Sequence, residues 1–431
     1  MTQPLTAPPL RVESREQVVH LLSQACELEH GVMCEYLFAL YSLKRRPDEG
    51  LTLEQLGQIA RWARTLSEIA AEEMLHLAQA TNLLTSIGAA PHLHRANFPI
   101  LSRWYPPGVQ IALVPFGERA LRHFLYLERP DYIELEDAEG FAAVHEAQPL
   151  TQAEGRRLMA VPQEYHTVGH LYRSIEHGLE LLVDRYGEEG VFIGPRRTQA
   201  TGEAFGWPEL HPVTDLATAK AGIELIIEQG EGAHGDWRDA HFGRFAAMLD
   251  EYLAVIAADP SFRPARPVRP AYAYSPPDVS GVALIGDPRT AAVADLLDAA
   301  YETTLQVLSR YFIHTDEEPG EVADLARTST DLMRQVLRPL GGLLTTLPLG
   351  PDHPGETAGP AFQIVQVSLF ALPYREAGWK ILVQRLGALA DTCAALGQET
   401  GLGQIAKLER SLRVMADRLQ SHLERRATET P

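Results

Sequence analysis

The chain has 431 residues and a formal net charge of −19, with 45% hydrophobic and 22% charged residues. This length is too great for one simple core and predicts two or three packed units. The acidic balance argues against a nucleic-acid or anionic-membrane partner. No uninterrupted apolar stretch reaches the ~18 residues that a membrane helix needs, and the amino terminus lacks the apolar core of a secretory signal. Three cysteines without a CxxC pair favour a cytoplasmic protein with unpaired thiols.

Apolar residues recur at three- and four-residue steps through most of the amino-terminal half, which is typical of helices. Five helical segments are predicted, over about residues 15–43, 52–88, 162–186, 213–230 and 236–258. Residues 89–160 are rich in proline, glycine and aromatic residues and predict a long loop-rich insertion. An insertion of this length needs packing of its own, and its aromatic residues are candidates to cover a site: Trp104, Tyr105, Phe116, Phe124 and Tyr126.

The proline-rich stretch 259–284 is typical of a semi-rigid linker. Further helices are predicted over 288–313, 319–346 and 378–426, and strand signals are weak throughout. The sequence therefore predicts an all-α protein, with an up-and-down helical bundle in residues 1–258 and a second helical domain in residues 285–431.

Acidic and imidazole side chains lie inside apolar helical runs, where an unpaired charge is costly. Glu29 lies between Leu28 and Val32 in the first helix, and Glu73 and His76 share one face of the second. The third helix carries His166, His170 and His177 near one face, and the fourth carries Glu228 and Glu231. Arg173 is a nearby cation that could neutralise one carboxylate by an ion pair.

Convergence on a metal is the other way to satisfy these groups. Bundle di-iron and di-manganese sites are built from a Glu on each of two helices and a Glu-x-x-His on each of the other two. Oxygen and nitrogen ligands suit iron, with manganese as the alternative. Glu35 and Glu72 are predicted to lie on the surface or behind the ligands, and His123 is predicted to be half-buried on a helix face.

Four stretches carry a family resemblance: "LEHGVMCEYLFALYSLK", "RWARTLSEIAAEEMLHLAQATNLLTSIGAAPHLHRANFP", "TVGHLYRSIEHGL" and "IIEQGEGA…HFGRF". They resemble the ferritin-like domain proteins of the iminophenyl-pyruvate dimer synthase type, whose longer relatives couple oxidised tryptophan imines. The resemblance implies a ferritin-like four-helix bundle and a ligand role for Glu29, Glu73, His76 and one or both of Glu228 and Glu231.

Two positions depart from the family pattern. His170 stands where the family has a carboxylate. This replacement would remove a bridging ligand and favour a site with one metal ion over a site with two. The pair Glu228 and Glu231 lacks the histidine of a Glu-x-x-His motif, and His234 or His241 is a candidate to supply it.

The predicted function is a metal-dependent oxidase or oxygenase that acts with O2 on a small, amino-acid-derived nitrogenous metabolite. It would use one or two iron ions held by Glu29, Glu73, His76, His170, Glu228 and Glu231. Glu228 would serve as ligand or base, and His166 and Tyr172 would support the ligands or relay protons. A metal-stabilised partner protein without catalytic activity is the alternative, and iron storage is a weaker one. The protein is expected to bind no nucleic acid or membrane, and a homo-oligomer is possible.

Overall fold

The computed structural model describes residues 10–101, 108–141, 160, 163–232, 236–276, 279, 282–366 and 373–429. Helices dominate these residues and the strands are short, which confirms the predicted all-α class. The chain divides into two compact units. Unit 1 comprises residues 1–92, 99–199 and 209–265, and unit 2 comprises residues 93–98, 200–208 and 266–431.

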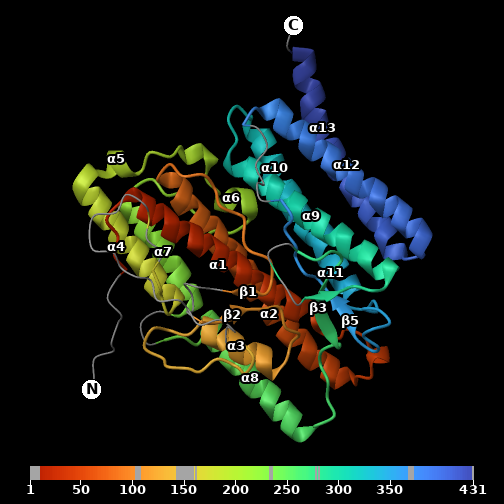
Figure 1. The fold of residues 1–431 in the computed structure, drawn as a ribbon. Coiled ribbons are helices and arrows are strands. Elements are labelled where there is room, and N and C mark those ends of the chain that lie inside the picture. The colour runs from red at the N-terminus through yellow and green to blue at the C-terminus, as the bar shows by residue number, and fades with distance from the viewer. Residues whose placement is uncertain are drawn as a thin grey trace. The chain divides into compact units, whose positions relative to one another are not determined.

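Four helices form the bundle of unit 1 (Figure 1): α1 (Arg15–Ser42), α2 (Leu53–Ser86), α4 (Val168–Tyr186) and α7 (Leu216–Gly230). Helix α1 packs against α2 and α4, and α7 packs against the same two helices. Each helix begins at a residue whose side-chain oxygen accepts a backbone N–H of the first turn: Ser14, Thr52, Thr167 and Asp215. These caps satisfy amide groups that have no partner within the helix.

The insertion between α2 and α4 contains a helix that the sequence analysis did not predict. Strands β1 (Ile100–Leu101) and β2 (Gln110–Ile111) pair antiparallel, and α3 (Glu118–Leu127) follows them. Helix α3 is amphipathic and buries Leu121 and Phe124. It packs against α8 (His241–Ala258), the helix that follows the bundle. Trp104 and Tyr105 lie outside the described residues.

Shorter elements complete unit 1. They are the 3-10 turns η1 (Pro47–Glu49) and η2 (Arg196–Thr198) and the helix α5 (Glu188–Val191). Ala265, at the end of the unit, forms an antiparallel bridge with Leu43, directly after α1. Cys26, Cys34 and Cys393 are buried thiols that form no disulfide.

Unit 2 is also helical. Its helices are α6 (Gly202–Phe205), α9 (Pro288–Phe312), α10 (Pro319–Asp331), the π-helical turn η3 (Leu332–Leu337), α11 (Arg338–Leu344), α12 (Arg375–Thr400) and α13 (Gly403–Glu429). Helices α12 and α13 lie side by side, joined at Gly401 in the left-handed conformation (Figure 1). A parallel sheet orders its strands as β4 (Ala283–Leu284), β3 (Val268–Tyr272) and β5 (Thr357–Gly359).

The segment 93–98 is held within unit 2 by buried polar contacts. Arg95 donates to the Tyr301 hydroxyl at 3.0 Å and to the Phe362 carbonyl at 2.6 Å, and Asn97 exchanges two hydrogen bonds with the backbone of Ile364. Strand β3 lies in the stretch that we predicted to be a linker. The domain boundaries at residues 258 and 285 stay predictions.

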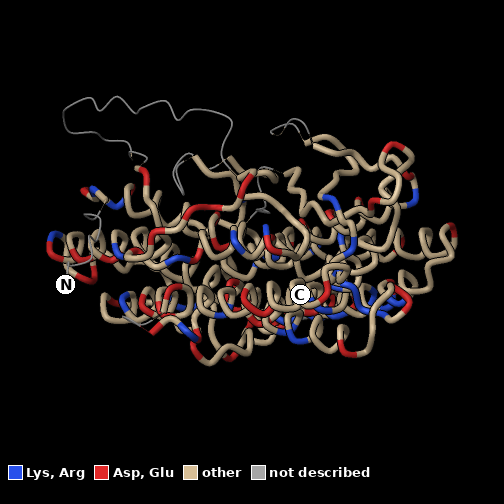
Figure 2. Tube along the Cα trace, turned by 90° about the horizontal axis from the view of Figure 1, so that it is seen from below, with Lys and Arg blue, Asp and Glu red and all other residues tan. Residues whose placement is uncertain are grey.

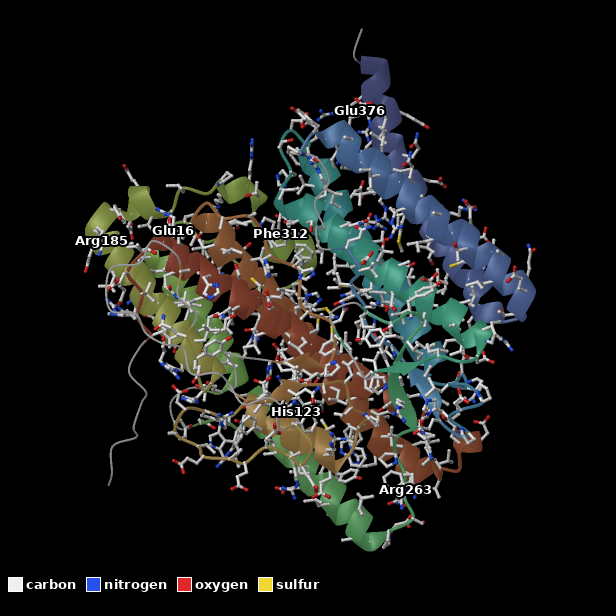
Figure 3. All side chains as sticks on the ribbon, in the orientation of Figure 1. Glu16, His123, Arg185, Arg263, Phe312 and Glu376 are labelled. Carbon is white, nitrogen blue, oxygen red and sulfur yellow. The ribbon has the colours of Figure 1, made fainter. Side chains whose placement is uncertain are left out.

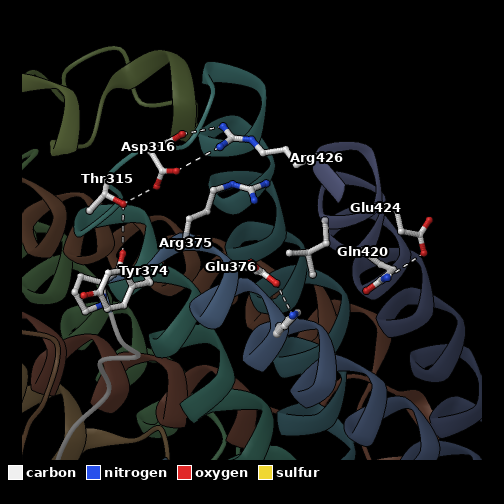
Figure 4. Close-up of a pocket in the computed structure, with 11 residues that line it drawn as sticks. Thr315, Asp316, Tyr374, Arg375, Glu376, Gln420, Glu424 and Arg426 are labelled. Carbon is white, nitrogen blue, oxygen red and sulfur yellow. Dashed lines mark hydrogen bonds and ion pairs between the residues drawn. The ribbon is translucent and has the colours of Figure 1, made fainter. Parts of the chain in front are cut away.

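Unit 2 has a half-open hollow with a volume of about 1070 Å³, shown in Figure 4. Arg426 pairs there with Asp316, and Lys380 pairs with Glu376, so these charges satisfy one another. Figure 2 shows acidic and basic residues interspersed along the described chain. Measured over the described residues, every helix is too short or too polar to span a membrane.

Candidate metal centre

Helices α1 and α2 bring together three residues that the sequence singled out. His76 Nδ1 lies 3.1 Å from Glu73 Oε2 and 3.7 Å from Glu29 Oε2. Less than 4% of each side chain is exposed. Glu73 and His76 are three residues apart on α2, so the helix itself places them on one face, and Glu29 meets them from α1. The three side chains therefore form one polar cluster within an apolar interface.

His241, the first residue of α8, completes this cluster. Its Nδ1 lies 2.7 Å from Glu73 Oε1, and its ring stacks on His76 with 5.3 Å between the centroids. Glu73 therefore presents one oxygen to each imidazole. Within the described residues, Glu73, His76 and His241 form a group whose candidate ligand atoms all lie within 4.8 Å of one another. The sequence offered His241 only as one of two candidates for the missing imidazole, and the other, His234, lies outside the described residues.

Further side chains hold this cluster from outside. The Tyr172 hydroxyl of α4 donates to Glu29 Oε1 at 2.7 Å. Gln229 Oε1 lies 2.9 Å from His76 Nε2. On the other ring, His241 Nε2 lies 3.0 Å from Glu72 Oε2, and Arg244 forms an ion pair with the same carboxylate. Such contacts fix the orientation of imidazole and carboxylate groups.

The charges of the cluster are strongly coupled. Burial raises the pKa of Glu29 to about 7, against the opposing effect of His76. Burial would also raise the pKa of Glu73, but the two histidines beside it lower that pKa instead. Burial would lower the pKa of His76, yet Glu73 and Glu29 raise it to about 10. Carboxylates likewise raise the pKa of His241. The site is therefore built to hold positive charge among carboxylates.

The remaining predicted site residues lie elsewhere. Glu228 is exposed on α7 and His166 is exposed before α4. Glu231, directly after α7, is buried and accepts the Gly169 backbone N–H at 2.7 Å, with Arg173 at 3.4 Å. Arg173, which also pairs with Asp131, gives this carboxylate a counter-charge. Burial raises the pKa of Glu231 to about 7.

His170 is buried on α4 but lies outside the converging group of Glu73, His76 and His241. Helix α7 instead reaches the cluster through Gln229, the residue between the two predicted glutamates. Glu231 caps the end of α7, and its backbone N–H still bonds to the Ile227 carbonyl as in a helix. The ligand roles of His170, Glu228 and Glu231 stay predictions.

A second buried cluster links α1 and α3 and was missed. His123 is fully buried, not half-buried as predicted, and lies on α3 as labelled in Figure 3. Its Nδ1 lies 2.8 Å from Asp137 and its Nε2 lies 3.3 Å from Glu35, which is also fully buried. Phe141 stacks on the imidazole with 3.6 Å between centroids. Burial would lower the pKa of His123, but the two carboxylates raise it to about 9.

This second cluster predicts a pH-dependent contribution to stability. The pKa of His123 is raised above its ordinary value of 6.5, so the stabilisation is fully present below pH 6.5 and is lost as pH rises through about 9. At pH 6.5, His123→Gln is expected to lower the free energy of unfolding by about 3 kcal/mol, because it leaves two carboxylates without a counter-charge. Urea unfolding at pH 6.5 and 9.5 measures the difference from wild type, which should shrink at the higher pH. A difference independent of pH would contradict this.

The donor set of the first cluster fits a metal ion. Glu73 Oε1 and His241 Nδ1 are 2.7 Å apart but do not have hydrogen-bond geometry, and among the described residues neither atom has a hydrogen-bond partner. Two buried ligand atoms that lie this close together without a hydrogen bond between them are a typical arrangement for ligands of one cation. Two imidazoles with carboxylates suit iron or manganese, and two histidines with one carboxylate are the donor set of non-haem iron sites.

Comparison with known proteins is consistent with this bundle. A family model described as Ferritin-like matches residues 22–250. The chain is 28% identical over 384 residues to 2-imino-3-(indol-3-yl)propanoate dimerase of Chromobacterium violaceum, which covers 83% of this chain and 35% of that protein. It is 24% identical over 432 residues to dichlorochromopyrrolate synthase of Lentzea aerocolonigenes, which covers 89% of this chain and 39% of that protein. The chain thus spans little more than a third of the length of these curated relatives.

A solved structure of a ferritin-like protein from Caulobacter vibrioides also matches. The TM-score is 0.46 at 20% sequence identity, with 74% of this chain and 95% of that chain covered.

Proposed function

This chain belongs to the ferritin-like family, whose model matches residues 22–250, and from that membership we propose that it is a metal-dependent oxidase or oxygenase. Its substrates would be O2 and a small, amino-acid-derived nitrogenous metabolite. The observation that carries the proposal is the convergence of Glu73, His76 and His241, all buried, with ligand atoms within 4.8 Å of one another. Glu29 lies beside them.

Glu29, Glu73, His76 and His241 would hold the metal. Iron is the ion that the donor set favours, with manganese as the alternative. When bound, iron would supply the redox chemistry with O2 that protein side chains lack. The protein's own contribution is to hold these four ligands in a buried site from which water is largely excluded. The roles predicted for Glu228 and His166 are not part of this proposal, because both side chains are exposed.

Residues around the ligands would set their orientation. Tyr172 holds Glu29 through a hydrogen bond, so that the other carboxylate oxygen remains directed toward His76. Gln229 and Glu72 each contact the Nε2 of one imidazole, which leaves both Nδ1 atoms facing Glu73. Removing such a contact typically lowers metal affinity by about 10–100-fold.

The substrate class follows from the relatives. One is named as a dimerase of 2-imino-3-(indol-3-yl)propanoate and the other as a dichlorochromopyrrolate synthase. Both names describe enzymes of indole or pyrrole metabolism. We infer that this chain acts on a related 2-imino acid or a product formed from one. The dimerising activity itself is not carried over, because this chain spans little more than a third of each relative.

Metal analysis of protein purified without added metal tests the proposal. We expect at least about one iron or manganese ion per chain, and O2 consumption when the reduced protein meets a 2-imino acid generated in situ from an aromatic amino acid. Protein treated with a chelator and then reloaded with Fe(II) is the control. Fewer than about half an ion per chain, with no uptake from Fe(II), would refute the metal site. Bound metal without O2 consumption would favour a partner protein without catalytic activity.

A further inference from the structure

Glu128 is a buried carboxylate beside the metal cluster that no sequence motif indicated. It follows α3 directly, in the inserted region, and only 5% of the residue is exposed. Its Oε2 lies 3.7 Å from His241 Nδ1, the nitrogen that also lies 2.7 Å from Glu73 Oε1. This carboxylate therefore faces the inner nitrogen of His241, on the side of the metal cluster, and not the outer nitrogen that Glu72 contacts.

The surrounding side chains hold Glu128 in this position. The Tyr36 hydroxyl of α1 donates to Glu128 Oε1. The Tyr36 ring is packed between Phe124 and Phe245, with centroid distances of 4.7 and 5.0 Å. Gly230, at the end of α7, lies beside this carboxylate, and a Cβ there would be in van der Waals contact with Glu128 Oε2 at 3.4 Å. Helices α1, α3, α7 and α8 thus all contribute to the position of one carboxylate.

We propose that Glu128 is a metal ligand that the inserted region contributes to the site. The inference rests on the proposed metal-dependent function and adds a residue to it. The tyrosine hydroxyl holds Oε1 of Glu128, and Oε2 is the oxygen of this carboxylate that lies toward His241 Nδ1, where a cation could bind it. Three carboxylates and two imidazoles would then surround the metal: Glu29, Glu73, Glu128, His76 and His241.

This assignment also accounts for the departure at His170. Helix α4 carries an imidazole where bundle sites of this type have a carboxylate. Glu128 restores a third carboxylate from a different element, since α3 packs against α8, which carries His241. The alternative is that Glu128 only neutralises an imidazolium at His241 and takes no part in binding metal. The two roles predict different effects of Glu128→Gln on metal affinity and on the spectrum of the bound metal.

Anaerobic titration of the full chain with Co(II) and Fe(II) separates them. Glu128→Gln keeps the size of the side chain and its contact with Tyr36 but removes the negative charge. We expect its affinity for Co(II) to fall at least about 10-fold and the visible absorption of bound Co(II) to change, because a ligand is lost. Glu35→Gln is the matched control, since it alters another buried carboxylate between α1 and α3 that pairs with His123.

An unchanged Co(II) affinity and spectrum in Glu128→Gln would overturn the proposal while leaving the metal site intact. Wild-type protein that takes up no metal would instead refute the proposed function itself. Equal losses of Co(II) affinity in Glu128→Gln and Glu35→Gln would show that damage to the α1–α3 contact is the cause. That result would also overturn the proposal. If Glu128→Gln does not fold, Glu128→Asp tests the same point. A shorter carboxylate should shift the Co(II) spectrum only if residue 128 binds the ion.

Discussion

If the proposed function holds, replacing Glu73 with alanine is expected to abolish metal binding and, with it, the proposed metal-dependent oxidation. Glu73 places one oxygen 2.7 Å from His241 Nδ1 and the other 3.1 Å from His76 Nδ1, so it is the carboxylate shared by both imidazoles. Its loss removes a ligand and the charge that orients the two rings. We expect the affinity for Fe(II) to fall by more than about 100-fold. Equilibrium dialysis followed by metal analysis measures this, and O2 consumption measures the activity.

Glu228→Ala is the matched control for Glu73→Ala. Both residues are glutamates that the sequence indicated as ligands, but Glu228 is exposed on α7. Glu228→Ala should keep wild-type metal content and a wild-type melting temperature. Glu73→Ala should also change the stability of the metal-free protein, because His76 and His241 lose the carboxylate that raises their pKa values. Wild-type metal content in Glu73→Ala would contradict the site, and loss of metal in Glu228→Ala would show that the ligands lie elsewhere.

The contrast between these two glutamates shows what the sequence could predict. Glu29, Glu73 and His76 lie within long, regular helices, where spacing fixes the face on which a side chain lies. Their convergence follows from the packing of α1 on α2. Glu231 is different: it caps the end of α7 with helical backbone angles, but its side chain meets Gly169 and Arg173 of α4. The structure pairs Glu231 with Arg173, a pairing that depends on tertiary contacts.

His241 and Glu128 show why the rest of the site was not predictable. His241 lies beyond the end of α7 in the sequence, so the sequence could offer it only as a candidate. Glu128 follows α3, which lies in a region whose proline and glycine content predicted loops. Helix α3 is short, and its apolar face is buried by packing against α8, a contact that the sequence alone does not reveal. The long helices of the bundle were predictable, whereas the residues added by the insertion depend on tertiary packing.

Gly243→Ala is expected to disrupt the proposed metal site without altering a proposed ligand. Gly243 lies on α8, two residues after His241. A Cβ at this position would lie 2.1 Å from the Trp237 carbonyl oxygen and 2.6 Å from that of Arg238. Both are backbone atoms, which cannot rotate away as a flexible side chain can. The start of α8 must therefore move, and His241 moves with it. We expect the free energy of unfolding to fall by about 2–3 kcal/mol.

Gly57→Ala provides the matched control, because Gly57 is exposed on α2 and a Cβ there has no neighbour within 4 Å. In a helix interior that change should stabilise the protein by up to about 1 kcal/mol. Urea unfolding of both variants, with Fe(II) titration of each, separates the effects. If His241 binds the ion, Gly243→Ala should lose metal affinity at temperatures where it remains folded. A folded Gly243→Ala protein with wild-type affinity would mean that the position of His241 does not matter for the metal. The site would then depend on α1 and α2 alone.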